Sequence, residues 1–286
     1  MNPVSRVSVI STGRVRIRPQ HARSDRTPQL WWLLTSRRWT QPLPINVFVI
    51  EHRDGIVLFD AGQDRRSVTD PHYFPRGIVG WLYRRLARFD IGPEDTVPAQ
   101  LRRLGLDPAR VSTIVLSHLH QDHIGAIGQF PGARIVVSAV EWGTLDGPMP
   151  ELAGLLADHI RVPGLNWELA TPVPTADQSI APFTSSHDVL GDGSLLLLPT
   201  PGHTPGSMSL VVRPAHGAPV LLIGDLSYDV NLLDAGHLPG VGRRAQLLET
   251  TRRVTELRER IPGLLLLAAH DPAVPALLTD PVEVRP

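Results

Sequence analysis

The densest group of side chains able to bind a metal lies at positions 118–123, which read HLHQDH. In an extended stretch His118 and His120 point to the same side of the chain, whereas Asp122 and His123 begin a turn or helix and can face a neighbouring point. Clustered imidazoles repel each other when protonated and lose hydration when buried, so a cation that holds them as neutral ligands is the simplest explanation. The spacing therefore predicts a site for two metal ions.

Three further positions offer ligands where a turn or a strand ends. His203 lies in the rigid turn PGHTPG between two apolar runs. Asp225 follows a strand predicted at 220–223, and His270 follows another predicted at 264–269. Each is weak evidence alone, because a lone histidine is more often a surface residue and an aspartate after a strand is often a helix cap. Together with the 118–123 segment they supply enough ligands for two coordination shells.

Composition limits how a metal can be held and which partners are plausible. The 286 residues include no cysteine, which excludes thiolate sites, iron-sulfur clusters and cysteine nucleophiles and leaves histidine and carboxylate as ligands. The 28 basic residues are all arginine, which excludes Schiff-base chemistry on lysine. They balance 28 acidic residues, so no charge imbalance suggests nucleic acid or an anionic membrane as a partner.

The chain also lacks signals for a membrane or an export route. The apolar run at 264–269 is far shorter than the roughly 20 residues that cross a bilayer. The first apolar run, at 7–10, is too short for the core of a signal peptide and is soon followed by arginines. We therefore expect a cytoplasmic protein with a small-molecule substrate.

The elements that must position these side chains follow from short apolar runs separated by glycine and proline. Several runs are apolar at consecutive positions, as in strands buried on both faces, and helical spacing occurs between them. The pattern favours an α/β fold, with two sheets between helical layers and a single domain over 1–286. Strands are predicted at 45–50, 56–59, 112–117, 133–138, 194–199, 207–212, 220–223 and 264–269, and helices at 78–89, 97–104 and 243–260.

The order of these candidate ligands resembles the metallo-β-lactamase superfamily, whose pattern is His-x-His-x-Asp-His followed by a distant His, a distant Asp and a final His. The resemblance implies an αββα sandwich of two mixed sheets between helical layers. The turn FDAG at 59–62 is similar to the family's Asp-x-Gly turn and implies that Asp60 orients a metal-binding histidine, although a plain turn aspartate is the alternative. The implied ligands are His118, His120 and His203 for one metal, Asp122, His123 and His270 for the other, and Asp225 as the bridge.

Two divalent ions facing only two aspartates leave a surplus of positive charge, which favours a bridging hydroxide that attacks a carbonyl or phosphoryl centre. Asp122 is the candidate to carry a proton to the leaving alkoxide. Zinc is the expected metal, and cobalt, manganese and iron suit the same ligands.

Tyr228, three positions after Asp225, narrows the substrate class. The spacing resembles the quorum-quenching N-acyl homoserine lactonases of this superfamily and implies that the tyrosine aids the substrate carbonyl or the leaving group. A tyrosine packed in the core is the alternative for this residue. We therefore predict a metal-dependent hydrolase of carboxylic esters that opens the lactone ring of N-acyl homoserine lactones. Phosphotriesters, aryl esters or other lactones are the alternative substrates. The alternative from a different functional class is a non-catalytic metal-binding protein.

Aromatic residues are candidates for binding the acyl chain of such a substrate. Trp31, Trp32 and Phe74 are the predicted substrate-binding residues, because an acyl chain needs an apolar lining. Aromatic clusters are more often core or dimer contacts, and the helix predicted at 78–89 could equally dock a second subunit. A homodimer is therefore possible.

Overall fold

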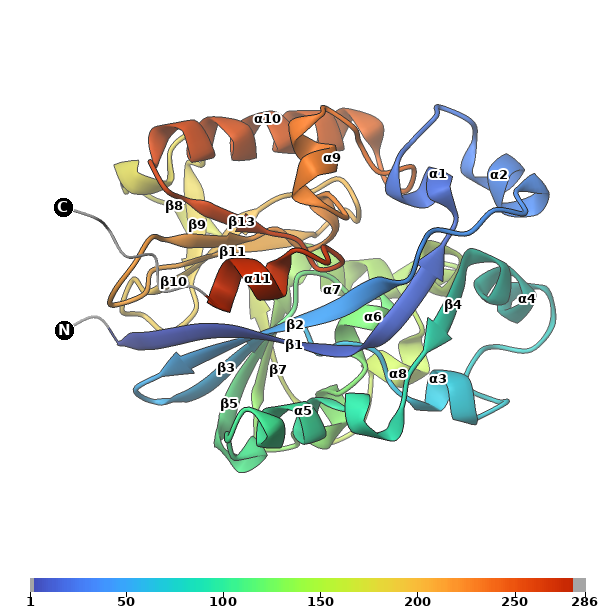
Figure 1. Ribbon diagram of the computed structural model, residues 1–286, viewed down its shortest axis with the longest axis horizontal. Helices are drawn as coiled ribbons and strands as arrows, with labels where there is room; N and C mark the ends of the chain where they lie inside the picture. The colour runs from blue at the N-terminus through green and yellow to red at the C-terminus, as the bar shows by residue number, and fades with distance from the viewer. Residues whose placement is uncertain (1–2, 280–286) are drawn as a thin grey trace.

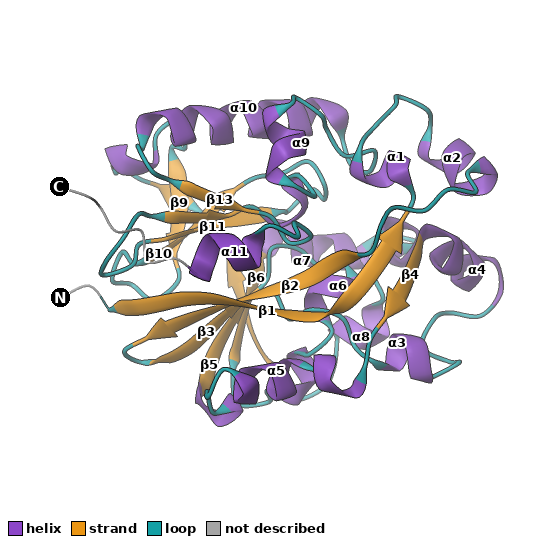
Figure 2. Ribbon diagram, viewed as in Figure 1, coloured by secondary structure: helices purple, strands orange, loops and turns teal. Residues whose placement is uncertain are grey.

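Two β-sheets lie face to face, with helices on their outer sides (Figures 1 and 2). The computed structural model describes residues 3–279. The seven strands of the first sheet run in the order β4-β1-β2-β3-β5-β6-β7, and the six of the second in the order β13-β12-β11-β10-β9-β8. Each sheet contains parallel and antiparallel pairs. The predicted fold of two mixed sheets between helical layers is confirmed.

The strands of the first sheet are β1 (Val4–Ile17), β2 (Leu43–His52), β3 (Gly55–Phe59), β4 (Ala87–Asp90), β5 (Val111–Val115), β6 (Arg134–Ser138) and β7 (Asn166–Ala170). Those of the second are β8 (Val173–Pro174), β9 (Ser185–Asp188), β10 (Leu195–Pro199), β11 (Met208–Val212), β12 (Val220–Leu222) and β13 (Leu265–Leu267). All eight strands expected from the sequence overlap one of these.

The helices are α1 (Pro19–Ala22), α2 (Gln29–Thr35), α3 (Arg66–Thr69), α4 (Gly77–Leu86), α5 (Val97–Arg103), α6 (Gln121–Ile124), α7 (Ala139–Gly143), α8 (Ala157–Ile160), α9 (Val230–Asp234), α10 (Arg244–Arg260) and α11 (Val274–Thr279). Short 3₁₀ turns lie at Pro93–Asp95, Pro108–Arg110, Ile127–Gln129, Thr144–Asp146, Pro150–Ala153, Gln178–Ile180 and Gly224–Leu226. No helix within 3–279 combines the length and the apolar character needed to cross a membrane.

Buried apolar side chains fill the space between the two sheets. Phe48 and Val115 of the first sheet and Leu210 and Leu222 of the second belong to one cluster and are essentially inaccessible to solvent. The outer face of each sheet has its own cluster, completed by α5 on the first sheet and α10 on the second (Figure 1). Strands covered on both faces need apolar residues at consecutive positions, which explains why their sequences do not alternate.

The predicted helix at 78–89 is wrong at its end. Helix α4 stops at Leu86, and the next residues form β4, in which Phe89 pairs with Val15 of β1. Pairing with a neighbouring strand outweighs the local helical spacing there. The strand β1 itself was not expected, although its exposed Arg14 and Arg16 alternate with the buried Val15 and Ile17 as in a strand with one covered face.

The packing of α10 on the second sheet gives a test of the fold. Leu257 is fully buried on this helix, whereas Leu248 is 58% exposed. We expect Leu257→Ala to lower the free energy of unfolding by about 2–5 kcal/mol, because it leaves a cavity against the sheet. The matched control, Leu248→Ala, should change it by less than about 0.5 kcal/mol. Urea denaturation measures both, and equal losses would contradict the packing of this helix.

Candidate metal centre

The candidate ligands meet where strands of both sheets end. His118, His120, Asp122 and His123 lie just after β5, in the loop that leads into α6 and in its first turn. The second sheet contributes three more, in the turn between β10 and β11, after β12 and after β13: His203, Asp225 and His270. Five of the seven are buried, and His120 and Asp122 are partly exposed. The structure therefore brings together all seven residues from segments far apart in the chain.

Short distances join these side chains around Asp225. The nitrogen His118 Nε2 lies 2.9 Å from His120 Nδ1, which lies 3.0 Å from His203 Nε2. One carboxylate oxygen of Asp225 lies 3.5 Å from His203 Nε2. The other oxygen lies 3.4 Å from both His123 Nε2 and His270 Nε2. Asp225 thus directs one oxygen to each of two histidine groups, as a bridging ligand does.

Three sets of side chains in this cluster have the geometry to hold a cation. In each set the ligand atoms lie within 4.8 Å of one another. The sets are His118, His120 and His203; His118, His123 and Asp225; and Asp122, His123 and His270.

Unpaired polar atoms indicate that a cation fits between them. His123 Nε2, His270 Nε2 and one oxygen of Asp225 are buried and have no hydrogen-bond partner in the described structure. A buried polar atom without a partner typically costs about 1–3 kcal/mol. Three such atoms that face one another, all of ligand type, match the donor set of a divalent metal.

The electrostatics of the cluster favour positive charge around Asp225. Burial alone would lower the pKa of His123, but the carboxylates of Asp60 and Asp225 outweigh it and raise the pKa well above its ordinary value. The pKa of His270 is raised in the same way, against burial, mainly by Asp225. Burial and the neighbouring imidazoles lower the pKa of His118, which therefore stays neutral. The carboxylates thus stabilise a cation where the unpaired atoms meet.

Asp60 fixes the orientation of His123. It is fully buried, and its carboxylate accepts hydrogen bonds from the Ser117 N–H at 2.7 Å, the Ser117 hydroxyl at 3.0 Å and His123 Nδ1 at 2.8 Å. This places the other ring nitrogen of His123 toward the cluster. Asp60 has a φ of +64°, which is rare for a residue other than glycine and indicates a backbone held by its surroundings.

Backbone carbonyls orient two more histidines. His270 Nδ1 donates to the carbonyl oxygen of Pro44 at 2.9 Å, and His120 Nε2 donates to that of Ala153 at 3.1 Å. In both rings the remaining nitrogen is the one that faces the cluster. Such bonds determine which nitrogen carries the proton and leave the other free for a metal.

Glu141 of α7 ties the two ligand-bearing loops together and was missed by the sequence analysis. Its buried carboxylate accepts from the Leu119 N–H at 3.1 Å, the Thr204 hydroxyl at 2.7 Å and the Gly206 N–H at 3.0 Å. These bonds join the loop after β5 to the turn that carries His203. In the sequence Glu141 resembles an ordinary first-turn helix residue, so no local signal distinguished it.

Tyr228 lies against the cluster. Its ring stacks on His270, with centroids 5.2 Å apart and planes 14° apart, and only 3% of the residue is exposed. Burial raises the pKa of the phenol well above its ordinary value, and the carboxylates of Asp225 and Asp122 raise it further. Tyr228 therefore keeps its proton and can act as a hydrogen-bond donor.

An apolar cavity of about 270 Å³ opens beside His120 and His203. Its apolar wall is formed by Val79, Leu82 and Leu86 of α4 together with Leu152, Pro205 and Val241. The cavity is large enough for a hydrocarbon chain, and two candidate metal ligands are among the residues that line it.

The three aromatic residues predicted to bind substrate lie elsewhere around the site. Trp31 is 64% exposed, and Trp32 is buried with its ring near that of His21. Phe74 packs against Tyr73 and Tyr83. None of the three is among the described residues that line the 270 Å³ cavity.

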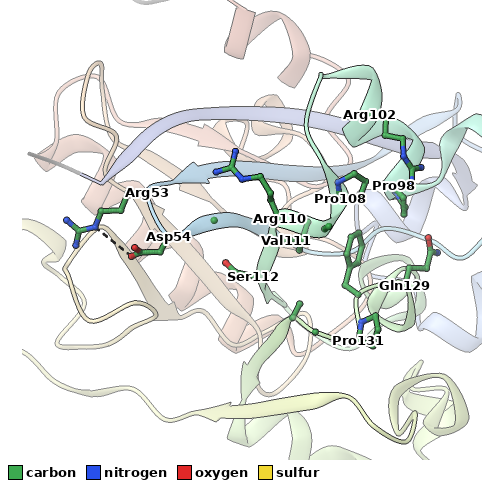
Figure 3. A pocket seen from close by; sticks show the side chains of 15 residues that line it. Arg53, Asp54, Pro98, Arg102, Pro108, Arg110, Val111, Ser112, Gln129 and Pro131 are labelled. Atoms are coloured by element: carbon green, nitrogen blue, oxygen red, sulfur yellow. Dashed lines mark ion pairs between the residues drawn. The ribbon is translucent and has the colours of Figure 1, made fainter.

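A larger hollow of about 750 Å³ lies at the opposite end of β5 (Figure 3). It is lined by Val111, the first residue of this strand, by Arg110 just before it, and by Arg53, Arg102 and Gln129. The candidate ligands follow the other end of the same strand. Size alone therefore does not identify the site, because chemistry needs the convergent ligands found at the smaller cavity.

The fold and this arrangement of ligands define a class of protein that comparison with known sequences identifies. The chain belongs to the Metallo-beta-lactamase superfamily, whose sequence profile matches residues 40–270. It is 34% identical over 234 residues to the N-acyl homoserine lactonase AttM of Azorhizobium caulinodans, which covers 80% of this chain and 82% of that protein. A probable metallo-hydrolase of Mycobacterium tuberculosis is 32% identical over 252 residues, covering 82% of this chain and 77% of the relative.

A solved structure with the same fold is an N-acyl homoserine lactone hydrolase with the product N-hexanoyl-L-homoserine bound at its catalytic metal centre. It superposes with a TM-score of 0.73 at 24% sequence identity and covers 94% of both chains. This likeness agrees with the fold, and the profile match over residues 40–270 confirms the family expected from the ligand pattern.

The hydrogen bond from His123 to Asp60 gives a test of the ligand geometry. We expect Asp60→Asn to weaken metal binding by about 10- to 100-fold, because it removes the charge that orients His123. Competition with a coloured chelator measures the affinity. Asp158→Asn, an exposed carboxylate on α8, is the control and should bind metal normally. Equal affinities for both variants would mean that Asp60 does not support the centre.

Proposed function

We propose that the chain is a dinuclear metal-dependent hydrolase that opens the lactone ring of N-acyl homoserine lactones. The observation that carries this proposal is the placement of Asp225 between two histidine groups, with Tyr228 stacked beside one of them. The substrate class rests on the similarity, over four fifths of the chain, to a relative named as an N-acyl homoserine lactonase.

The proposed ligand sets follow the two groups around Asp225. Its two oxygens support its role as the bridge, because they face different histidines. Two divalent ions held there supply a water of lowered pKa and polarise an ester carbonyl. Zinc is the first candidate, with cobalt, manganese and iron as alternatives that suit the same ligands. The sets are His118, His120 and His203 for one ion, and Asp122, His123 and His270 for the other.

Two side chains of this protein then serve the reaction directly. In ring opening, water adds its oxygen to the lactone carbonyl carbon, the bond from that carbon to the ring oxygen breaks, and the ring oxygen gains a proton. The protonated Tyr228 donates a hydrogen bond to the carbonyl oxygen or to the leaving oxygen. Asp122, whose side chain is 19% exposed compared with 4% for Asp225, can reach the substrate and carries the proton to the ring oxygen.

The acyl chain of the substrate fits the apolar cavity beside His120 and His203. Two candidate ligands and the α4 side chains line the same cavity, so a lactone held at the ligands would have this apolar space beside it for its chain. Trp31, Trp32 and Phe74 stay candidate substrate residues at the periphery. Of these, Trp32 is linked to the site through its contact with His21.

A cytoplasmic homodimer is part of the same proposal. Apolar side chains on two neighbouring helices support a second copy as partner: Leu30 and Trp31 on α2 are 61% and 64% exposed, and Ile78 and Trp81 on α4 are 73% and 43% exposed. Exposed apolar groups of this kind are typical of protein interfaces.

The first experiment follows proton release as metal-loaded protein is given a short and a long N-acyl homoserine lactone, a phosphotriester and an aryl ester. We expect metal-dependent opening of the lactones at rates well above those for the other two substrates. Removal of metal with a chelator should abolish turnover, and added zinc should restore it. Turnover of the phosphotriester or aryl ester alone would overturn the lactonase proposal while leaving the metal centre intact.

The role of Tyr228 is tested by Tyr228→Phe. We expect this variant to retain both metals and the fold but to lose about 10²- to 10³-fold in kcat, as is typical when one donor to a developing oxyanion is removed. Metal analysis and steady-state kinetics measure the two quantities. Thr69→Val, which removes an exposed hydroxyl bonded to the Arg65 carbonyl away from the cavity, is the control and should keep most activity. An unchanged kcat in Tyr228→Phe would exclude the proposed role.

A further inference from the structure

His21 is a buried histidine beside the candidate centre that none of the roles assigned above uses. It lies on α1, directly after β1, and only 8% of it is exposed. Its ring meets Tyr228 edge to face, with centroids 5.3 Å apart and planes 70° apart, and lies 6.0 Å from the ring of Trp32. Tyr228 is therefore packed between His270 and His21.

The backbone around His21 is fixed on both sides. Its N–H donates to the Arg18 carbonyl at 2.9 Å, and its own carbonyl accepts from the Gly240 N–H at 2.9 Å. A side chain at Gly240 would meet the Gln20 carbonyl at 2.0 Å, so the loop at 240 approaches α1 as closely as glycine permits. The imidazole is thus held rigidly beside Tyr228, which lowers the entropy cost of using it to bind a ligand.

The side chain of His21 has no hydrogen bond within the described residues. Its Nδ1 is buried and has no hydrogen-bond partner there. A phenylalanine would pack against Tyr228 equally well without burying an unpaired polar atom. The histidine therefore makes physical sense where a ligand supplies the missing partner.

The protonation state of His21 defines what that partner can be. Burial lowers its pKa to about 4, although the carboxylates of Asp225 and Asp122 oppose the shift. At neutral pH the ring is thus uncharged and has one N–H donor and one nitrogen acceptor. A secondary amide can pair with one of these atoms, either through its N–H to the nitrogen acceptor or through its carbonyl oxygen to the N–H.

We infer, on the basis of the proposed function, that His21 recognises the amide group of the N-acyl homoserine lactone. In this substrate the amide nitrogen is attached to the ring carbon next to the lactone carbonyl. With that carbonyl at Tyr228, the amide is the next polar group of the substrate, and His21 is the unpaired polar side chain packed against Tyr228. His21 is therefore a specificity residue that separates acylated homoserine lactones from simple lactones.

The test compares two substrates in the same sample of metal-loaded enzyme: an N-acyl homoserine lactone and an alkyl γ-lactone of similar length that lacks the amide. The ratio of their kcat/KM values does not depend on the fraction of folded protein. We expect His21→Phe, which keeps the aromatic contact, to lower this ratio by about 3- to 10-fold, the effect of one neutral hydrogen bond. His21→Gln, which restores a donor and an acceptor, should recover part of it.

The control variant is His216→Phe, the same substitution at an exposed histidine between β11 and β12, which should leave the ratio unchanged. If His21→Phe slows both lactones equally, His21 acts only through Tyr228 or the fold, and the inference is overturned. Equal rates for both lactones in the unaltered enzyme would also overturn it. If the unaltered enzyme opens neither lactone, the proposed function itself fails, and the inference fails with it.

Discussion

The structure depends on placing buried carboxylates among buried histidines. Asp225 lies at the junction of two imidazole groups, and without compensation these groups would be expensive to remove from water. The cost of burying each group is lower because the Asp225 carboxylate and the imidazoles, which can carry opposite charges, lie a short distance apart. The polar atoms that remain unpaired converge at a point where a cation fits. The fold has to hold the seven candidate ligands in fixed relative positions so that their charges compensate one another. Surrounding polar contacts serve that purpose.

Those contacts come from residues that are not candidate ligands. Asp60 orients His123, and the Pro44 carbonyl orients His270. Glu141 joins the loop after β5 to the turn that carries His203. Charged side chains with full sets of donors are rigid, because movement would leave a buried carboxylate unpaired. These contacts determine the geometry of the candidate metal centre, and the apolar cavity beside it adds a surface for binding the substrate.

The sequence predicted the fold class and the family because their signals are local or strongly patterned. The 118–123 segment concentrates its ligands in six positions, and the buried strands are apolar enough to be recognised singly. Contacts between residues that are far apart in the chain leave no such local pattern in the sequence. Glu141 looks like a helix residue, His21 lies before any recognised motif, and β4 was read as helix because its partner β1 is not a neighbour in the chain. The residues of the cavity wall escaped prediction for the same reason, since at least four separate segments of the chain must be brought together before they form a surface.

The candidate ligands are divided between the two sheets. The loop after β5 supplies four of them, and the segments that follow β10, β12 and β13 supply the other three. A cation held by both groups would add a cross-link between the two layers, beside their shared apolar core and polar bonds such as those from Thr204 and Gly206 to Glu141. Metal binding and the docking of one sheet on the other are then thermodynamically linked, so each makes the other more favourable. During folding, the complete centre forms only once β13 has joined its sheet, which makes the bound metal a reporter of finished assembly.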